Sequence, residues 1–139
     1  MRRAFAIAAL ATAALSVATL AGCGDVAADL FSVTRSGSVA GATFAMVPRD
    51  DGTVTCNGVR RPLPGDLLVT AREIQRAITD ATTNGLRLPS GPRPVFTYSV
   101  QSSSGRLSFS DDSPHQIKAL YQLAELTRQV ARGVCGLAR

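Results

Sequence analysis

Apolar and polar residues alternate in the segments beyond residue 29, a pattern typical of β-strands with one buried face. Residues 30–36, LFSVTRS, place Phe31 and Val33 on the same face. Residues 42–57 contain two further alternating runs separated by Asp51-Gly52, which is a turn signal, and they therefore predict a β-hairpin. The folded part of the chain is thus expected to begin with three strands.

The proline- and glycine-rich residues 57–66 predict a loop that leads into an amphipathic helix, in which apolar residues recur at spacings of three and four. Thr70 followed by Glu73 matches the capping box of a helix start. Asp66 offers an alternative start one turn earlier, and Asn84-Gly85 supplies the stop.

A second hairpin is expected after the proline-rich residues 86–94. Residues 95–101 and 106–110 alternate on either side of an SSSG turn. The side chains expected to face inward are Phe96, Tyr98, Val100, Leu107 and Phe109.

A long apolar stripe predicts a final helix, with Ser113 as its N-cap, Pro114 at its first position and Gln116 completing a capping box. Gly133 or Gly136 would end it. The stripe consists of Ile117, Leu120, Tyr121, Ala124, Thr127, Ala131 and Val134, widened by Leu123, Leu126 and Val130. So broad an apolar face requires a sheet beneath it.

Taken in order, these elements predict an α+β fold. We expect an antiparallel sheet of about five strands with two helices packed on one face, in the order β-β-β-α-β-β-α. Residues 30–139 would form a single domain, preceded by an export signal over residues 1–22 and a short tether over residues 23–29.

The N-terminal residues carry the export signal. Arg2 and Arg3 precede an uncharged run, residues 4–22, which is as long as a membrane span, but its many alanines and small final residues favour cleavage. Leu20-Ala21-Gly22-Cys23 resembles the lipobox of bacterial lipoproteins. The resemblance implies cleavage before Cys23, lipid on its thiol, and anchoring to the extracytoplasmic side of the cell membrane.

Two alternatives to this export route stay open. An ordinary signal-peptidase cut nearby would leave Cys23 unmodified, and Arg2-Arg3 partly matches the twin-arginine signal that exports folded cargo. The remainder of the chain is similar in style to small uncharacterised lipoproteins of GC-rich bacteria, a resemblance that implies no particular site.

With Cys23 assigned to lipid, Cys56 and Cys135 remain as an even pair in an oxidising compartment, so a disulfide is expected between them. Closing so long a loop is worth about 4 kcal/mol in the chain-entropy model. The alternatives are two buried free thiols or a metal pair. Because His115, the only histidine, lacks the usual ligand spacing to these cysteines, no metal or other cofactor is expected.

The charge of the chain is weakly basic, because the formal net charge of +5 falls to +3 once Arg2 and Arg3 leave with the signal. This balance predicts a mixed, solvated surface and no nucleic-acid partner. The candidate partner-contact residues lie in the two proline-rich loops and are Arg60, Arg61, Arg87 and Arg93.

Candidate catalytic chemistry is sparse: no nucleophile elbow, phosphate loop or metalloprotease motif occurs, and His115 beside Asp111 and Asp112 suits a helix start. We therefore expect a non-catalytic, lipid-anchored cell-envelope protein that binds a protein or envelope partner or maintains the envelope. The alternatives are an enzyme of unrecognised type and a protease inhibitor. Residues 53–66 faintly resemble the exported subtilisin-inhibitor family, although no cysteine lies near residues 86–94 to pin a reactive loop.

Overall fold

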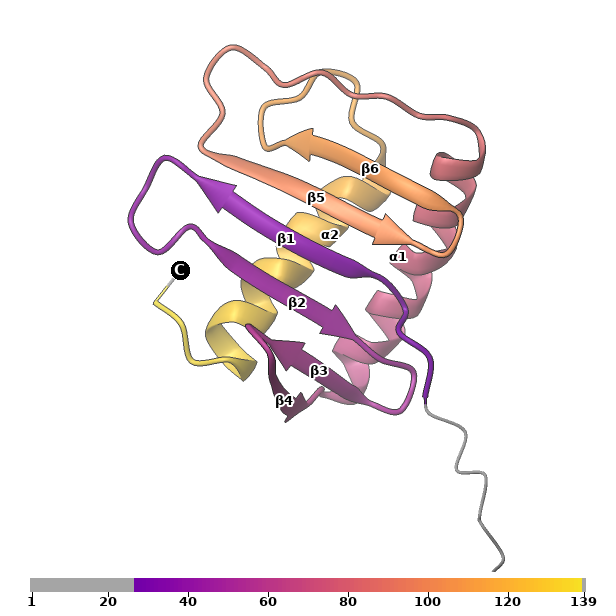
Figure 1. Ribbon diagram of the computed structural model, residues 1–139, viewed down its shortest axis with the longest axis vertical. Helices are drawn as coiled ribbons and strands as arrows, with labels where there is room; N and C mark the ends of the chain where they lie inside the picture. The colour runs from indigo at the N-terminus through magenta and orange to yellow at the C-terminus, as the bar shows by residue number, and fades with distance from the viewer. Residues whose placement is uncertain (1–26, 139) are drawn as a thin grey trace, which may run out of the picture.

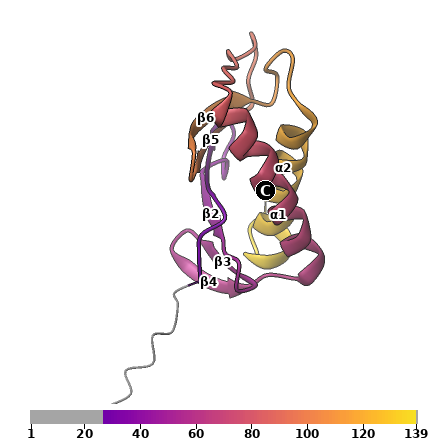
Figure 2. The same cartoon turned by 90° about the vertical axis from the view of Figure 1, so that its right-hand side faces the viewer.

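A computed structural model describes residues 27–138, and it shows a six-stranded antiparallel sheet with both helices on one face (Figures 1 and 2). The α+β prediction is confirmed, with one strand more than expected. The elements are β1 (Ser32–Gly37), β2 (Phe44–Pro48), β3 (Thr53–Cys56), β4 (Val59–Pro62), α1 (Gly65–Thr83), β5 (Phe96–Ser102), β6 (Gly105–Ser110), α2 (Lys118–Gln129) and the π-helix η1 (Val130–Val134).

The strand order across the sheet is β4-β3-β2-β1-β5-β6. The first strand, β1, pairs with β2 on one side and with β5 on the other, and so joins the two hairpins that the sequence predicted. Strands β4 and β6 therefore form opposite edges of the sheet, and α1 carries the chain from the β4 edge back towards β5 (Figure 1).

Strand β4 corrects the prediction of a loop over residues 57–66. Asn57 and Gly58 both have positive φ, 46° and 87°, which is the geometry of the two-residue type I′ hairpin turn. The two prolines of this stretch argued for a loop. Pro62, however, ends an edge strand, where a missing N–H costs no ladder hydrogen bond.

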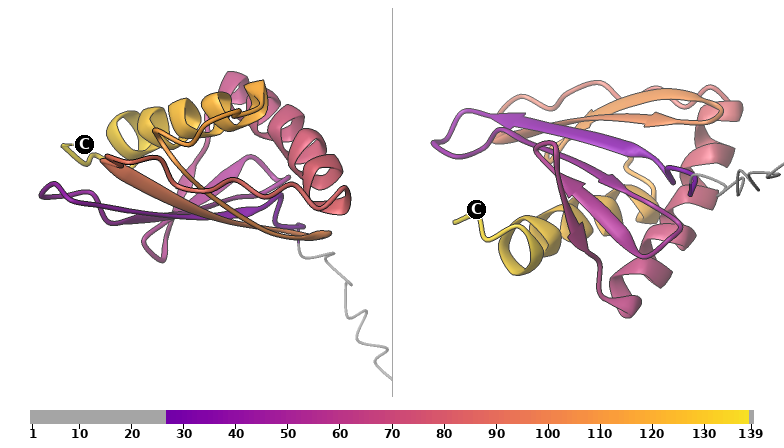
Figure 3. Two further views of the ribbon diagram at one scale, coloured as in Figure 1. Left: turned by 90° about the horizontal axis from the view of Figure 1, so that it is seen from above. Right: turned by 60° about the horizontal axis from the view of Figure 1, so that its bottom comes forward.

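The core lies between the sheet and the two helices (Figure 3, left). Inward positions of the strands alternate with exposed ones, as the period of two requires. The large side chains that are fully buried are Val33, Phe44, Met46, Val54, Val100 and Phe109 of the sheet, Ile74 and Ile78 of α1, and Leu120, Leu123 and Leu126 of α2, with Val130 of η1.

Helix α1 begins earlier than the Thr70 capping box predicts and close to the alternative start at Asp66. It starts at Gly65, directly after Pro64, and no side chain caps it. The Thr70 hydroxyl instead donates to the carbonyl of Asp66 inside the helix at 3.0 Å. The predicted stop is confirmed, since Asn84 follows the last helical residue.

Helix α2 begins at Lys118, not after Ser113. His115 has a φ of 60°, in the left-handed region, which interrupts the backbone before the helix starts. Ser113 Oγ accepts a hydrogen bond from the backbone N–H of Ser110 at 2.8 Å, and Gln116 Nε2 donates to the Ser113 carbonyl at 3.1 Å. These polar groups, which the sequence suggested as helix caps, build a turn instead.

The C-terminal end of α2 widens into η1, and the chain then reaches Cys135, which forms the expected disulfide with Cys56 at the end of β3. The two Cα atoms lie 5.9 Å apart across a sequence separation of 79 residues. The disulfide therefore ties the last helical turn to the sheet. Within residues 27–138 no helix has the length and apolarity that crossing a membrane requires.

Candidate anion-binding pocket

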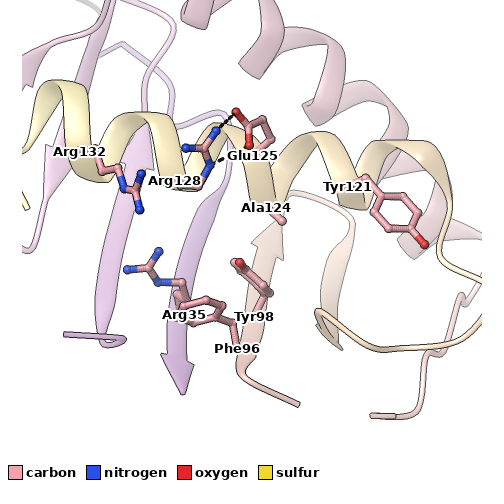
Figure 4. A pocket seen from close by; sticks show the side chains of 8 residues that line it. All are labelled: Arg35, Phe96, Tyr98, Tyr121, Ala124, Glu125, Arg128 and Arg132. Carbon is pink, nitrogen blue, oxygen red and sulfur yellow. Dashed lines mark hydrogen bonds and ion pairs between the residues drawn. The ribbon is translucent and has the colours of Figure 1, made fainter. Parts of the chain in front are cut away.

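A cavity of about 440 Å³ opens between α2, η1 and the sheet strands β1 and β5 (Figure 4). This volume falls within the range typical of small-molecule sites. It is lined by Arg35 of β1, Phe96 and Tyr98 of β5, Tyr121, Ala124, Glu125 and Arg128 of α2, and Arg132 of η1.

Arg35 forms the floor of the pocket and occupies a position where the strand pattern calls for an apolar residue. It lies two residues after Val33 and four after Phe31, on the same inward face of the strand, and only 2% of its surface is exposed. Its Nε donates to the carbonyl of Ala42 at 2.8 Å, and its guanidinium carbon lies 5.0 Å from the ring centroid of Phe96. The fold thus holds a positive charge inside the helix-covered face of the sheet.

The second cation is Arg132, whose side chain faces Arg35 across the cavity (Figure 4). Burial lowers the pKa of Arg35, the neighbouring Tyr98 acts in the opposite direction, and the positive charge of Arg132 lowers it further. Among the described residues 27–138, Arg132 forms no hydrogen bond or ion pair. Two like charges that face one another across a cavity attract an anion placed between them.

The third arginine, Arg128, is engaged by Glu125 on the same helix. Its Nε donates to Glu125 Oε2 at 2.9 Å, its second terminal nitrogen pairs with Oε1, and Gln129 Nε2 donates to Oε1 at 2.8 Å. These hydrogen bonds lower the pKa of Glu125 and raise that of Arg128. The one carboxylate among the lining residues is therefore partnered already, and the pocket keeps a positive balance.

The opposite end of the pocket is apolar. The ring of Tyr98 stacks on Phe109 with centroids 4.8 Å apart and planes inclined by 11°, which fixes its orientation. Burial raises the pKa of the Tyr98 phenol. Ala124 lies above this ring and Tyr121 stands at the rim with 59% of its surface exposed (Figure 4). Tyr121 is thus not part of the buried stripe that the sequence predicted.

The four arginines predicted as partner contacts lie elsewhere. Arg60 and Arg61 are successive exposed residues of β4, so their side chains point to opposite faces of the sheet. Arg87 and Arg93 lie beyond the other sheet edge, where the backbone N–H of Arg93 donates to Asp112 at 2.7 Å. The structure therefore does not bring these four residues into one surface.

Two other candidates from the sequence have different outcomes. Cys23 lies outside the described residues. His115 is exposed in the turn before α2 and does not line the pocket. Residues 27–138 contain no group of three or more histidine, cysteine or acidic side chains that could hold a metal ion.

Compared with known proteins, the chain matches no family model, no curated protein and no solved structure. The assignment of the pocket therefore rests on its own geometry.

Sequence reasoning missed the pocket although signals for it were present. Arg35 interrupts an alternating apolar face, and Arg128 and Arg132 follow Tyr121 and Ala124 at the helical spacings of three and four. The sequence did not indicate that β1 pairs with β5, and only this pairing places Arg35 beside Tyr98.

Proposed function

We propose that this protein is an exported, non-catalytic binding module that holds a small anionic ligand between Arg35 and Arg132. The observation that carries the proposal is a nearly buried arginine at an inward strand position, facing a second arginine across an open cavity. Burying a charge is costly unless it is hydrogen-bonded, and Arg35 keeps its charge here by donating to the Ala42 carbonyl and lying beside the ring of Phe96. Arginine presents a planar fork of donors that suits carboxylates and phosphates.

Binding suits the lining groups better than catalysis does. Guanidinium groups keep their protons at all ordinary pH values, and the Glu125 carboxylate is held by Arg128 and Gln129. A general acid or base would need a group that changes its protonation state near neutral pH. The pocket is therefore built to attract and orient an anion.

The position of the pocket fits the expected lipid anchor on Cys23. Only residues 24–26 separate Cys23 from Ala27, a stretch that can extend over roughly 14 Å at most. Ala27 precedes β1, which starts at Ser32, whereas Arg35 lies two residues before the end of that strand at Gly37. An anchored protein would thus present the pocket away from the membrane, towards solutes or polymers of the envelope.

Calorimetric titration of the purified full chain with inorganic phosphate at low ionic strength tests the binding proposal. We expect saturable binding that weakens at least tenfold in Arg132→Ala, because a hydrogen bond to a charged group is worth about 1.5–3 kcal/mol. Arg60→Ala, which removes the same charge from the β4 edge, is the matched control and should bind like the parent. Absence of saturable binding, or equal weakening by Arg60→Ala, would overturn the proposal.

The anchor is tested separately by Cys23→Ala. Release into the medium or accumulation of uncut precursor is expected if Cys23 carries lipid. Membrane retention of a normally cleaved variant would exclude the anchor without affecting the pocket.

A further inference from the structure

The pocket has two chemically different ends, and a simple inorganic anion would use only one. Arg35 and Arg132 form the cationic end, while Tyr98, Ala124 and Tyr121 form the apolar end (Figure 4). The two ends are continuous, because the lining residues follow one side of α2 and η1 above neighbouring strands. A ligand that fills the cavity therefore carries its charge at one side and an apolar body at the other.

The volume supports the same conclusion. A cavity of about 440 Å³ lies within the range of about 300–1,000 Å³ that is typical of small-molecule sites. A single carboxylate or phosphate group fills only a small part of that space. The remainder lies beside the two tyrosine rings and an alanine methyl group, whose carbon surfaces contact apolar atoms well, while the two phenol hydroxyls can hydrogen-bond.

The shape of the apolar end selects a flat group. Tyr98 is only 4% exposed, so it offers the pocket a small part of a ring whose tilt is locked by its stack on Phe109. Ala124 is the smallest side chain among the lining residues, and a larger one there would lie over that ring. Tyr121, exposed at the rim, lies to one side of Ala124 and forms the outer wall of this end of the pocket. Aromatic stacking contributes beyond the area that it buries.

From these features we infer that the ligand is a small aryl anion, in which a carboxylate or phosphate is attached to a planar, unsaturated ring. The inference rests on the proposed function, since the anion must first bind between Arg35 and Arg132. It adds that the ring lies against Tyr98 below Ala124, and that this contact provides much of the affinity and the selectivity.

Calorimetric titration of the full chain with three probes tests the inference: inorganic phosphate, phenyl phosphate and phenol. Phenyl phosphate should bind at least tenfold more tightly than inorganic phosphate, and phenol should bind weakly. In Ala124→Leu the advantage of phenyl phosphate over inorganic phosphate should fall to less than threefold. Ala81→Leu, the same change at a half-buried position of α1 away from the pocket, should leave it intact.

A second variant keeps the test independent of folding. Tyr121 is exposed, so Tyr121→Ala removes a wall of the pocket without disturbing the core, and it should lower phenyl phosphate affinity severalfold with little effect on inorganic phosphate. If inorganic phosphate binds and phenyl phosphate gains nothing, the aryl inference fails while the proposed function stands. If neither binds, both fail. A gain that survives both Ala124→Leu and Tyr121→Ala places the ring elsewhere and also overturns the inference.

Discussion

The molecule carries two groups of arginines with opposite characters. Arg60 and Arg61 are neighbours in the sequence, stand on the exposed edge strand β4 and diverge to opposite faces. Arg35 and Arg132 are 97 positions apart in the numbering, yet they face one another across a single cavity. The sequence neighbours Arg60 and Arg61 thus share no surface, while strand pairing and helix packing bring Arg35 and Arg132 to the same pocket.

The difference has a physical basis in how each group is held. On an edge strand, charged residues are solvated and discourage pairing with other chains, so Arg60 and Arg61 need no partner. Arg35 is held by the Ala42 carbonyl and by aromatic rings, and Arg132 sits in η1 just before the disulfide at Cys135. Arg35 therefore has the restricted geometry that specific ligand binding requires, whereas the exposed Arg132 is positioned only by the backbone of η1.

The largest effect is expected from removing the disulfide. This change should disturb the arrangement of Arg35 and Arg132 and leave Arg60 and Arg61 as they are. Cys56→Ala combined with Cys135→Ala should lower the free energy of unfolding by about 4 kcal/mol, because the unfolded chain regains the freedom of a long loop. Freed from β3, the end of η1 should also hold Arg132 less firmly and weaken phosphate binding. Denaturant unfolding and calorimetry check both effects, and unchanged stability would contradict the expectation.

The next effect separates binding from stability at Arg35. Arg35→Met should weaken phosphate binding at least tenfold, because the buried guanidinium is lost. The free energy of unfolding should change much less than the binding does, since relief of charge burial offsets the lost hydrogen bonds and cation–π contacts, among them those to Ala42, Gly41 and Phe96. Thermal unfolding and titration of the same sample measure the two quantities. A collapse of the fold would show that Arg35 is structural.

A smaller, local effect is expected on acidification at the β6 edge. Asp112 accepts hydrogen bonds from Ser110 Oγ and from the backbone N–H groups of Arg93 and Gly91, which lower its pKa below the ordinary value. The contribution of ionised Asp112 to the stability of the fold is therefore complete above the pKa of an unfolded aspartate, about 3.9. It is lost as the pH falls through the lower pKa that Asp112 has in the folded protein.

Amide exchange at Gly91 and Arg93 checks this acid effect, because protection there should fall with Asp112 protonation while the amides of β1 and β5 stay protected. Asp112→Asn should remove the pH dependence. Equal loss of protection in β1 at the same pH would indicate general acid unfolding instead.

The smallest effect is expected from substitutions of the exposed arginines on β4. Arg60→Ser and Arg61→Ser should each change the free energy of unfolding by no more than about 0.5 kcal/mol, because exposed charges without partners contribute little. Phosphate affinity should match that of the parent chain. The property expected to change is self-association. The double variant should associate more readily at high concentration, because it lacks the charges that protect the edge strand, and light scattering can measure this.

Much of the fold could be predicted from local pattern. The alternating runs around Val33, the first hairpin and the second hairpin occur where period-two burial placed them, and the stop at Asn84-Gly85 is in place. The predictions were wrong where a polar or turn-forming residue fits more than one kind of local structure. Ser113 and Gln116 bond to neighbouring backbone in a turn, and the Asn57-Gly58 turn extends the sheet by a strand that two prolines obscured.

By itself, the sequence determined the fold class, the two hairpins and the pairing of Cys56 with Cys135, because periodicity and cysteine count are local or compositional properties. The tertiary structure alone decided the pocket. Arg35 meets Tyr98 only through β1–β5 pairing, and Arg132 reaches them only because α2 and η1 cross that part of the sheet. Such contacts depend on long-range packing, which no short stretch of residues encodes.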